Sequence, residues 1–276
     1  LIFIFSFFLF NRFLVTRKQK NIIQDQKQEV DKAYTELEIQ KDKVESKNKE
    51  IMSSINYAKK IQRAILPEED LMHDFFSKHF IFYHPKDIVG GDFYWYKCFG
   101  DLAVIATVDC TGHGVSGGFM SMMGSLLLDK IIKKDNLDAS AILSELNNEI
   151  IRVLKQNSRG NIQDGMDLAL CIVDKKKRQL HFSGARNCIM LVAEKKAIRY
   201  DADLLPVGGL YSRKSKETVR AYKSHVIPLK ENTWVFMYSD GYYDQLGGDK
   251  KVSLGIHGFE DVLMKTAINK QDKKKI

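Results

Sequence analysis

Residues 21–66 contain neither glycine nor proline, and an apolar residue recurs there at every seventh position. The recurring residues are Ile23, Val30, Leu37, Val44, Ile51, Ala58 and Ile65. A seven-residue repeat keeps these side chains on one face of a helix, which is the seam of a coiled coil. The pattern therefore predicts a long signalling helix over residues 17–66. Pro67 is expected to end this helix, because proline cannot continue one.

The second position of this seam is weak, because polar residues such as Gln26, Gln40 and Lys47 stand where a second apolar residue would pack. A seam with one good layer per heptad is marginally stable by itself. We therefore expect a parallel homodimer whose poor packing lets it shift between states. A single solvated helix is the alternative interpretation.

Residues 1–15 read LIFIFSFFLFNRFLV and are almost entirely apolar. A bilayer span needs about 20 such residues, so residues 1–16 are expected to be the end of a transmembrane helix. The basic residues that follow, Arg17, Lys18 and Lys20, would lie on the cytoplasmic side. The alternatives are a signal-peptide remnant and a buried core helix. We thus expect a protein of the cytoplasmic membrane whose main domain lies in the cytoplasm.

The charge distribution supports a membrane surface over nucleic acid. Residues 1–66 hold 13 Lys/Arg against 8 Asp/Glu, so +5 of the net charge of +8 lies beside the apolar run. No clustered basic face with aromatic residues stands out elsewhere, so nucleic-acid binding is not expected.

The four cysteines, Cys98, Cys110, Cys171 and Cys188, form no CxxC pair, which argues against a zinc site or a disulfide framework.

Residues 67–276 are expected to form one α+β domain. Strand-like runs occur at 80–84, 93–99, 102–108, 167–173, 179–183, 188–193, 218–227 and 233–239. Helical patterns fit 116–134, 139–156 and 258–268. Strands come in runs and helices in a block, which indicates antiparallel sheets with helices packed on them.

Two carboxylates lie at the ends of one predicted hairpin. Gly100 and Asp101 suit a two-residue type II′ turn between the runs 93–99 and 102–108. The resulting register places Asp92 directly opposite Asp109, where like charges are unfavourable. A divalent cation would convert this repulsion into coordination, since Mg²⁺ and Mn²⁺ prefer oxygen ligands. Two solvated loop acids, or a slipped register that separates them, are the alternatives.

The surrounding sequence supports a metal site. Gly90 and Gly91 precede Asp92, and the stretch DCTGHGVSGG after the second strand is rich in glycine, which permits close approach of the backbone to a ligand. Asp240 and Gly241 follow the apolar run TWVFMYS in the same manner. Three strand-end carboxylates suit a centre of two metal ions that activates a water for attack on phosphorus.

Five ordered motifs make the chain resemble the SpoIIE-like (RsbU-type) bacterial serine phosphatases, a branch of the metal-dependent PPM family related to type 2C phosphatases. The motifs are VGGDFY, DCTGHGVSGGFMS, DGMDLALCIVD, SGARN and YSDGYYDQLGG. The resemblance covers residues 50–268, including the helix INYAKKIQRAILP that leads into such domains. It implies an α-β-β-α sandwich with Mn²⁺ or Mg²⁺ at the sheet edge, and hydrolysis of phosphoserine or phosphothreonine on a protein such as an anti-sigma-factor antagonist.

The resemblance also implies roles for individual residues. Asp92 and Asp109 would bind or bridge the two ions, the Cys110 backbone carbonyl would complete the bridge, and Asp240 would bind the second ion. Asp167 is interpreted as structural support. His113 is not placed like the histidine of type 2C enzymes, so we interpret it as a structural loop residue rather than a general acid.

One departure from the family pattern concerns the end of the chain. The last metal-binding acid of the family lies in an Asp-Asp motif followed by a closing strand, which is not found before the final NKQDKKKI, where Asp272 is a poor substitute. We therefore expect the phosphatase domain to be truncated at its C-terminal end. A catalytically silent module that binds a phosphoprotein with the same fold is therefore the alternative function. A nucleotide cyclase or kinase output is a third hypothesis, but no phosphoacceptor histidine motif or nucleotide-binding glycine box supports it.

Overall fold

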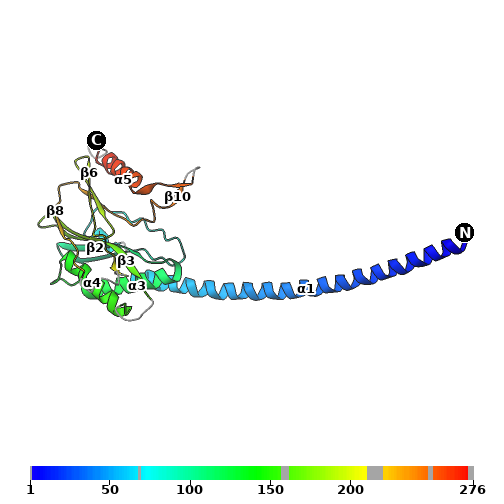
Figure 1. The fold of residues 1–276 in the computed structure, drawn as a ribbon. Helices are drawn as coiled ribbons and strands as arrows, with labels where there is room; N and C mark the ends of the chain where they lie inside the picture. The colour runs from blue at the N-terminus through cyan, green and yellow to red at the C-terminus, as the bar shows by residue number, and fades with distance from the viewer. Residues whose placement is uncertain (1, 68–69, 157–161, 210–219, 248–250, 273–276) are drawn as a thin grey trace. The chain divides into compact units, whose positions relative to one another are not determined.

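The computed structural model describes residues 2–67, 70–156, 162–209, 220–247 and 251–272 (Figure 1). The chain divides into two units, Leu1–Ile55 and Asn56–Ile276. Helix α1 (Ile2–Ile65) makes up the first unit and continues into the second. The predicted long helix is thus confirmed, and it ends two residues before Pro67, since the residue before a proline disfavours the helical conformation.

The first unit presents its apolar side chains to solvent. Residues 2–54 are all exposed, including the seam residues Ile23, Val30 and Leu37. Within the described residues, none of the helices carries an apolar stretch of the length that a bilayer crossing requires. Pairing of α1 with a second copy through the seam stays a prediction.

The second unit is built on a large antiparallel sheet in the order β1-β2-β3-β4-β8, with β7 paired to β3. Its strands are β1 (Phe93–Phe99), β2 (Leu102–Cys110), β3 (Gly165–Asp174), β4 (Gln179–Ala185), β7 (Val207–Gly208) and β8 (His225–Pro228). A second sheet has the order β6-β5-β9. It contains β5 (Ile189–Ala193), β6 (Lys196–Tyr200) and β9 (Trp234–Met237), and β10 (Leu246–Gly247) pairs separately with β11 (Val252–Ser253).

The described part of the second unit also contains the helices α2 (Asp70–His73), α3 (Gly114–Ile131), α4 (Ala139–Val153) and α5 (Gly255–Asp272). Helices α3 and α4 lie against one face of the large sheet, and α5 covers the second sheet (Figure 1). The amphipathic helix α4 begins at the N-cap Asp138, whose carboxylate accepts a hydrogen bond from the Ala141 amide at 2.8 Å.

Three apolar clusters hold these layers together. Leu128 and Ile142 of the helices pack with Trp95 of the large sheet in the first cluster. Phe182 and Ile189 meet between the two sheets in the second, and Phe236 packs with Ala267 of α5 in the third. The α-β-β-α sandwich of antiparallel sheets expected from the resemblance is therefore confirmed.

Two strand predictions were wrong. Residues 80–84 are irregular, because their side chains make separate contacts instead of a ladder: the Tyr83 hydroxyl donates to the Asp92 carbonyl oxygen at 3.1 Å, and the Phe82 ring meets the Tyr242 ring. The predicted strand 218–227 is reduced to β8, with 220–224 irregular and 218–219 outside the described residues. Strand β6 was missed, since charged residues interrupt its short sequence KAIRY and it lies at an exposed sheet edge.

Candidate metal centre at the sheet edge

The hairpin predicted from Gly100 and Asp101 is confirmed. Strands β1 and β2 pair from Phe99 opposite Leu102 to Phe93 opposite Val108. Gly100 has a φ of +70°, as the first position of a type II′ turn requires. Continuing this register by one pair places Asp92 opposite Asp109 at the open end of the hairpin.

The alternation of side chains along the strands decides which face these acids occupy. Phe93 and Val108 pack in the cluster beneath helices α3 and α4, so their neighbours Asp92 and Asp109 point to the other face, between the sheets. Asp167 of β3 pairs with Asp109 in the β2–β3 register. Three acids therefore lie in a row across neighbouring strands at one edge of the large sheet.

Asp240 joins this row from the second sheet. It lies three residues after the end of β9, and the hydroxyl of its neighbour Ser239 donates to Asp92 Oδ2 at 2.6 Å. The carboxyl groups of Asp92 and Asp240 lie close enough to Asp109 to raise its pKa through their charge and through hydrogen bonding. The structure thus brings together the three acids singled out in the sequence, with contributions from both sheets.

The crowding of carboxyl groups alters their protonation. Burial, followed by the charges of Asp92 and Asp240, raises the pKa of Asp109 from 3.8 to about 9. Burial also raises the pKa of Asp240, partly offset by the hydrogen bond with Asp109. The pKa of Asp167 is raised by burial as well, while the charge of Arg186 acts in the opposite direction. The crowding therefore favours the protonated carboxyl of Asp109, and positive charge entering the centre would oppose this.

The glycine-rich segments allow the backbone to approach this centre. A Cβ atom at Gly91 would lie 2.7 Å from the Gly112 carbonyl oxygen and 3.1 Å from that of Cys110. The Cys110 side chain is buried on the helix side of the sheet, and burial raises the pKa of its thiol well above the usual range. If Cys110 contributes a ligand, as the resemblance implies, the group available for this is its backbone carbonyl.

The donor set suits hard divalent cations. Mg²⁺ prefers oxygen ligands and is usually held by one or two protein carboxylates while it keeps several waters. Among the described residues no group of three or more His, Cys, Asp or Glu side chains has the spacing of a preformed ion site, so Asp92, Asp109 and Asp240 lie near one another without forming a closed set of ligands. Asp92, Asp109 and Asp240 present oxygen atoms alone, which fits Mg²⁺ or Mn²⁺ completed by water and excludes a thiolate-rich zinc cage among these three residues.

Two further residues considered in the sequence are His113 and Asp272. His113 is exposed in the loop before α3, where its Nδ1 lies 2.9 Å from Asp87 Oδ2. This pairing supports the interpretation of His113 as a loop residue. Asp272 is the last residue of α5, and its side chain lies outside the described residues.

Gln62 is a residue of this region that sequence reasoning missed. It is 4% exposed, and its Nε2 donates to the Gly90 carbonyl oxygen and to Ser121 Oγ, both at 2.7 Å. Its Oε1 accepts a hydrogen bond from the Gly90 amide at 3.3 Å. The end of α1 is therefore joined to the loop that carries Gly91 and Asp92. A glutamine between Ala58 and Ile65 on the apolar side of the helix was the signal available in the sequence.

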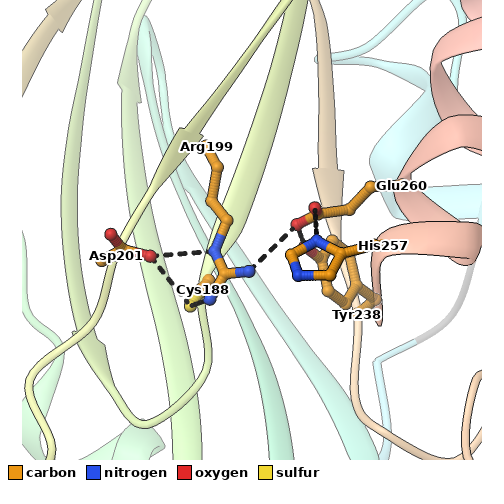
Figure 2. Close-up of polar contacts among 6 residues, drawn as sticks. All are labelled: Cys188, Arg199, Asp201, Tyr238, His257 and Glu260. Carbon is orange, nitrogen blue, oxygen red and sulfur yellow. Dashed lines mark hydrogen bonds and ion pairs between the residues drawn. The ribbon is translucent and has the colours of Figure 1, made fainter. Parts of the chain in front are cut away.

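A polar network fixes the end of β9 that leads to Asp240 (Figure 2). The Tyr238 hydroxyl donates to Glu260 Oε1 of α5 at 3.0 Å, and Arg199 of β6 places its Nη1 3.5 Å from the same oxygen. Arg199 Nε also donates to Asp201 at 2.8 Å, and its Nη2 contacts Cys188 Sγ. Helix α5 and the second sheet are thus joined two residues before Asp240.

The chain is similar to one known protein family and to several solved structures. The family model of Stage II sporulation protein E (SpoIIE) matches residues 100–274. The SiaA-PP2C domain of Pseudomonas aeruginosa is 32% identical with a TM-score of 0.69, covering 79% of this chain and 82% of that one. The RsbU and RsbW domains of Rv1364c from Mycobacterium tuberculosis are 20% identical with a TM-score of 0.49, covering 65% of this chain and 46% of that one.

A comparison with curated protein sequences found no match. The SpoIIE match extends over more than half of the chain, and it includes β2, β3 and the segment that bears Asp240. The sequence of the SiaA domain agrees over a still larger share. The chain therefore belongs to the SpoIIE family of PP2C-type, metal-dependent phosphatases.

Proposed function

We propose that the protein is a serine/threonine phosphatase that hydrolyses a phosphorylated regulatory protein with the help of two Mn²⁺ or Mg²⁺ ions. The observation that carries this proposal is the meeting of Asp92, Asp109 and Asp240, which come from separate strand ends of both sheets. An anti-sigma-factor antagonist is the substrate class that the resemblance suggests. Family membership supports phosphatase activity, and the choice of a phosphoserine or phosphothreonine protein is our proposal.

In this proposal the carboxylates of Asp92, Asp109 and Asp240 hold the ions, and the Cys110 carbonyl oxygen is a further ligand. The chemistry that the ions supply when bound is activation of a water and neutralisation of phosphoryl charge. Ser239 orients one oxygen of Asp92 through its 2.6 Å hydrogen bond. Gly241 leaves room beside Asp92, since a Cβ there would lie 3.4 Å from Oδ2, and Gly91 leaves room beside the Cys110 carbonyl oxygen.

We further propose that the domain is the output of a membrane-linked signalling protein. The exposed apolar residues at the start of α1 and the basic residues Arg17, Lys18 and Lys20 favour a membrane next to them. A weak parallel dimer through the seam of α1 would transmit the signal, and Gln62 provides a contact from this helix to the loop of the metal centre. Cosedimentation of the chain with anionic lipid vesicles tests the membrane part. Recovery of the protein in the supernatant would refute it.

The deciding experiment measures phosphate release from a phosphoserine protein with and without Mn²⁺. We expect release that requires the ion and is lost in Asp92→Asn, because this substitution removes a charged oxygen donor and leaves the shape of the side chain. Asp101→Asn, at the opposite end of the same hairpin, is the matched control and should retain full activity. Absence of ion-dependent release, together with tight binding of the phosphoprotein, would favour the silent binding module instead.

A further inference from the structure

The row of charged residues at the edge of the large sheet extends beyond the three acids already described. Leu168 of β3 pairs with Ala185 of β4, so the next pair outward is Asp167 and Arg186. Together with the registers of β1, β2 and β3, this gives the order Asp92, Asp109, Asp167, Arg186 across four neighbouring strands. A cationic side chain therefore stands at the end of a row of carboxylates.

The position of Arg186 is fixed by its backbone. Its φ is +62°, a conformation that non-glycine residues rarely adopt. The Arg186 amide donates to the Asp203 carbonyl oxygen at 2.7 Å, and the Asp203 amide donates to the Gly184 carbonyl oxygen at 2.9 Å. A Cβ at Gly184 would lie 2.6 Å from the Asn187 carbonyl oxygen. Such a strained residue, held by its surroundings, is a frequent feature of functional sites.

The guanidinium group is held loosely and remains accessible. Arg186 Nη1 lies 3.8 Å from Asp167 Oδ1, and Nε donates to the Leu204 carbonyl oxygen at 3.3 Å, while the side chain is 55% exposed. A guanidinium has five N–H donors, so donors remain for a ligand. Arg199 differs in this respect, because Asp201, Glu260 and Cys188 surround its guanidinium (Figure 2).

A phosphate monoester carries two negative charges toward a centre lined by Asp92, Asp109, Asp167 and Asp240. Metal ions offset part of this repulsion, and a second source of positive charge on the protein would orient the phosphoryl oxygens. Arginine suits this task, because its planar fork pairs with phosphate through two hydrogen bonds. We propose that Arg186 binds a non-bridging oxygen of the substrate phosphoryl group, and this proposal rests on the function proposed above.

The test compares Arg186→Asn and Arg186→Lys with Arg178→Asn. Asparagine tolerates positive φ, and Arg178 is an exposed arginine with a φ of +52° just before the opposite end of β4, which makes it a matched control. In Arg186→Asn we expect KM for the phosphoprotein and the inhibition constant of inorganic phosphate each to rise at least about tenfold, as for loss of a charged hydrogen bond. Arg186→Lys should recover part of both, and Arg178→Asn should change neither.

The Mn²⁺ concentration for half-maximal thermal stabilisation is measured in parallel and should stay unchanged in Arg186→Asn. Unchanged phosphate inhibition would overturn the proposal, and so would a loss of Mn²⁺ affinity as large as the change in KM, because Arg186 would then act through Asp167. If the native protein releases no phosphate, the function proposed above fails. Stabilisation of the Mn²⁺-loaded protein by inorganic phosphate then still decides the role of Arg186: loss of this effect in Arg186→Asn supports it, and retention refutes it.

Discussion

Replacing Asp109 with asparagine is expected to stabilise the metal-free protein. A raised carboxyl pKa means that the folded state holds a proton that the unfolded chain releases, so stability falls as pH rises from about 4 to about 9. At about 1.4 kcal/mol per pH unit, the shift from 3.8 to about 9 corresponds at face value to about 7 kcal/mol. Asp109 is only partly buried, so solvent screens part of this cost, and we expect about 2–3 kcal/mol.

Asparagine keeps the shape of the side chain and can still hydrogen-bond to Asp92 and Asp240, but it carries no charge. In EDTA at pH 8, thermal unfolding of Asp109→Asn should therefore occur about 5–10 °C above that of the native protein, given about 2–4 °C per kcal/mol for a domain of this size. Near pH 4.5 the difference should largely vanish. Asp101→Asn, in the turn of the same hairpin, should behave as the native protein at both pH values.

Mn²⁺ should reverse the order of stability. The native protein gains stability from an ion that binds the folded state alone, whereas Asp109→Asn lacks one charged donor and should gain much less. Circular dichroism melts across a Mn²⁺ titration measure both effects. If Asp109→Asn is less stable than the native protein in EDTA at pH 8, or if Mn²⁺ stabilises both proteins equally, Asp109 does not belong to a crowded group of carboxyl groups that binds a cation.

The remaining predictions concern the backbone and helix contacts of the site. Gly91→Ala should lower activity and Mn²⁺ affinity at least about tenfold, because its Cβ would meet the Gly112 carbonyl oxygen at 2.7 Å. Isothermal titration with Mn²⁺ measures the affinity, and an affinity equal to that of the native protein would contradict the prediction. Gln62→Leu removes the 2.7 Å hydrogen bond to the Gly90 carbonyl, which keeps the Ser121 hydroxyl as a more distant donor at 3.2 Å, so we expect the free energy of unfolding in urea to fall by about 1–3 kcal/mol and activity to fall. Lys59→Leu on the same helix is the control, and equal effects of both would count against the contact. Replacing Gln26, Gln40 and Lys47 with leucine in one variant should lock α1 as a dimer. Sedimentation should then show a larger mass, and activity should stay at one fixed level. An unchanged mass and an unchanged response to signal would reject the predicted seam.

The sequence predicted the hairpin and its acids because the information is local. A glycine at the first turn position fixes the register of β1 and β2, and the register fixes the pairing of Asp92 with Asp109. The meeting with Asp240 follows from a repeated pattern, an apolar strand that ends in an acid and a glycine. Local patterns thus identify the three residues, whereas the approach of Asp240 to the other two depends on how the two sheets pack.

Gln62 and Arg186 could not be found in this way. Gln62 acts through Gly90 and Ser121, which are 28 and 59 residues away in the chain, and such contacts leave no periodic pattern. Arg186 lies just beyond the end of β4, and the β3–β4 register that places it beside Asp167 is not visible in its local sequence. Strand β6 was missed for a related reason, since an edge strand with one neighbour and an exposed face has little need of apolar residues.

The assembly of the centre from two sheets links catalysis to the interior of the sandwich. Asp92 and Asp109 belong to the large sheet, whereas Asp240 follows β9 of the second sheet. The apolar cluster around Phe182 and Ile189 holds the two sheets in place against each other. A sliding motion of a few ångströms along that cluster would pull the third acid out of reach while leaving every strand intact. Enzymatic turnover should therefore report on the fit between the sheets, and fail under mild heating before spectroscopic signs of melting emerge.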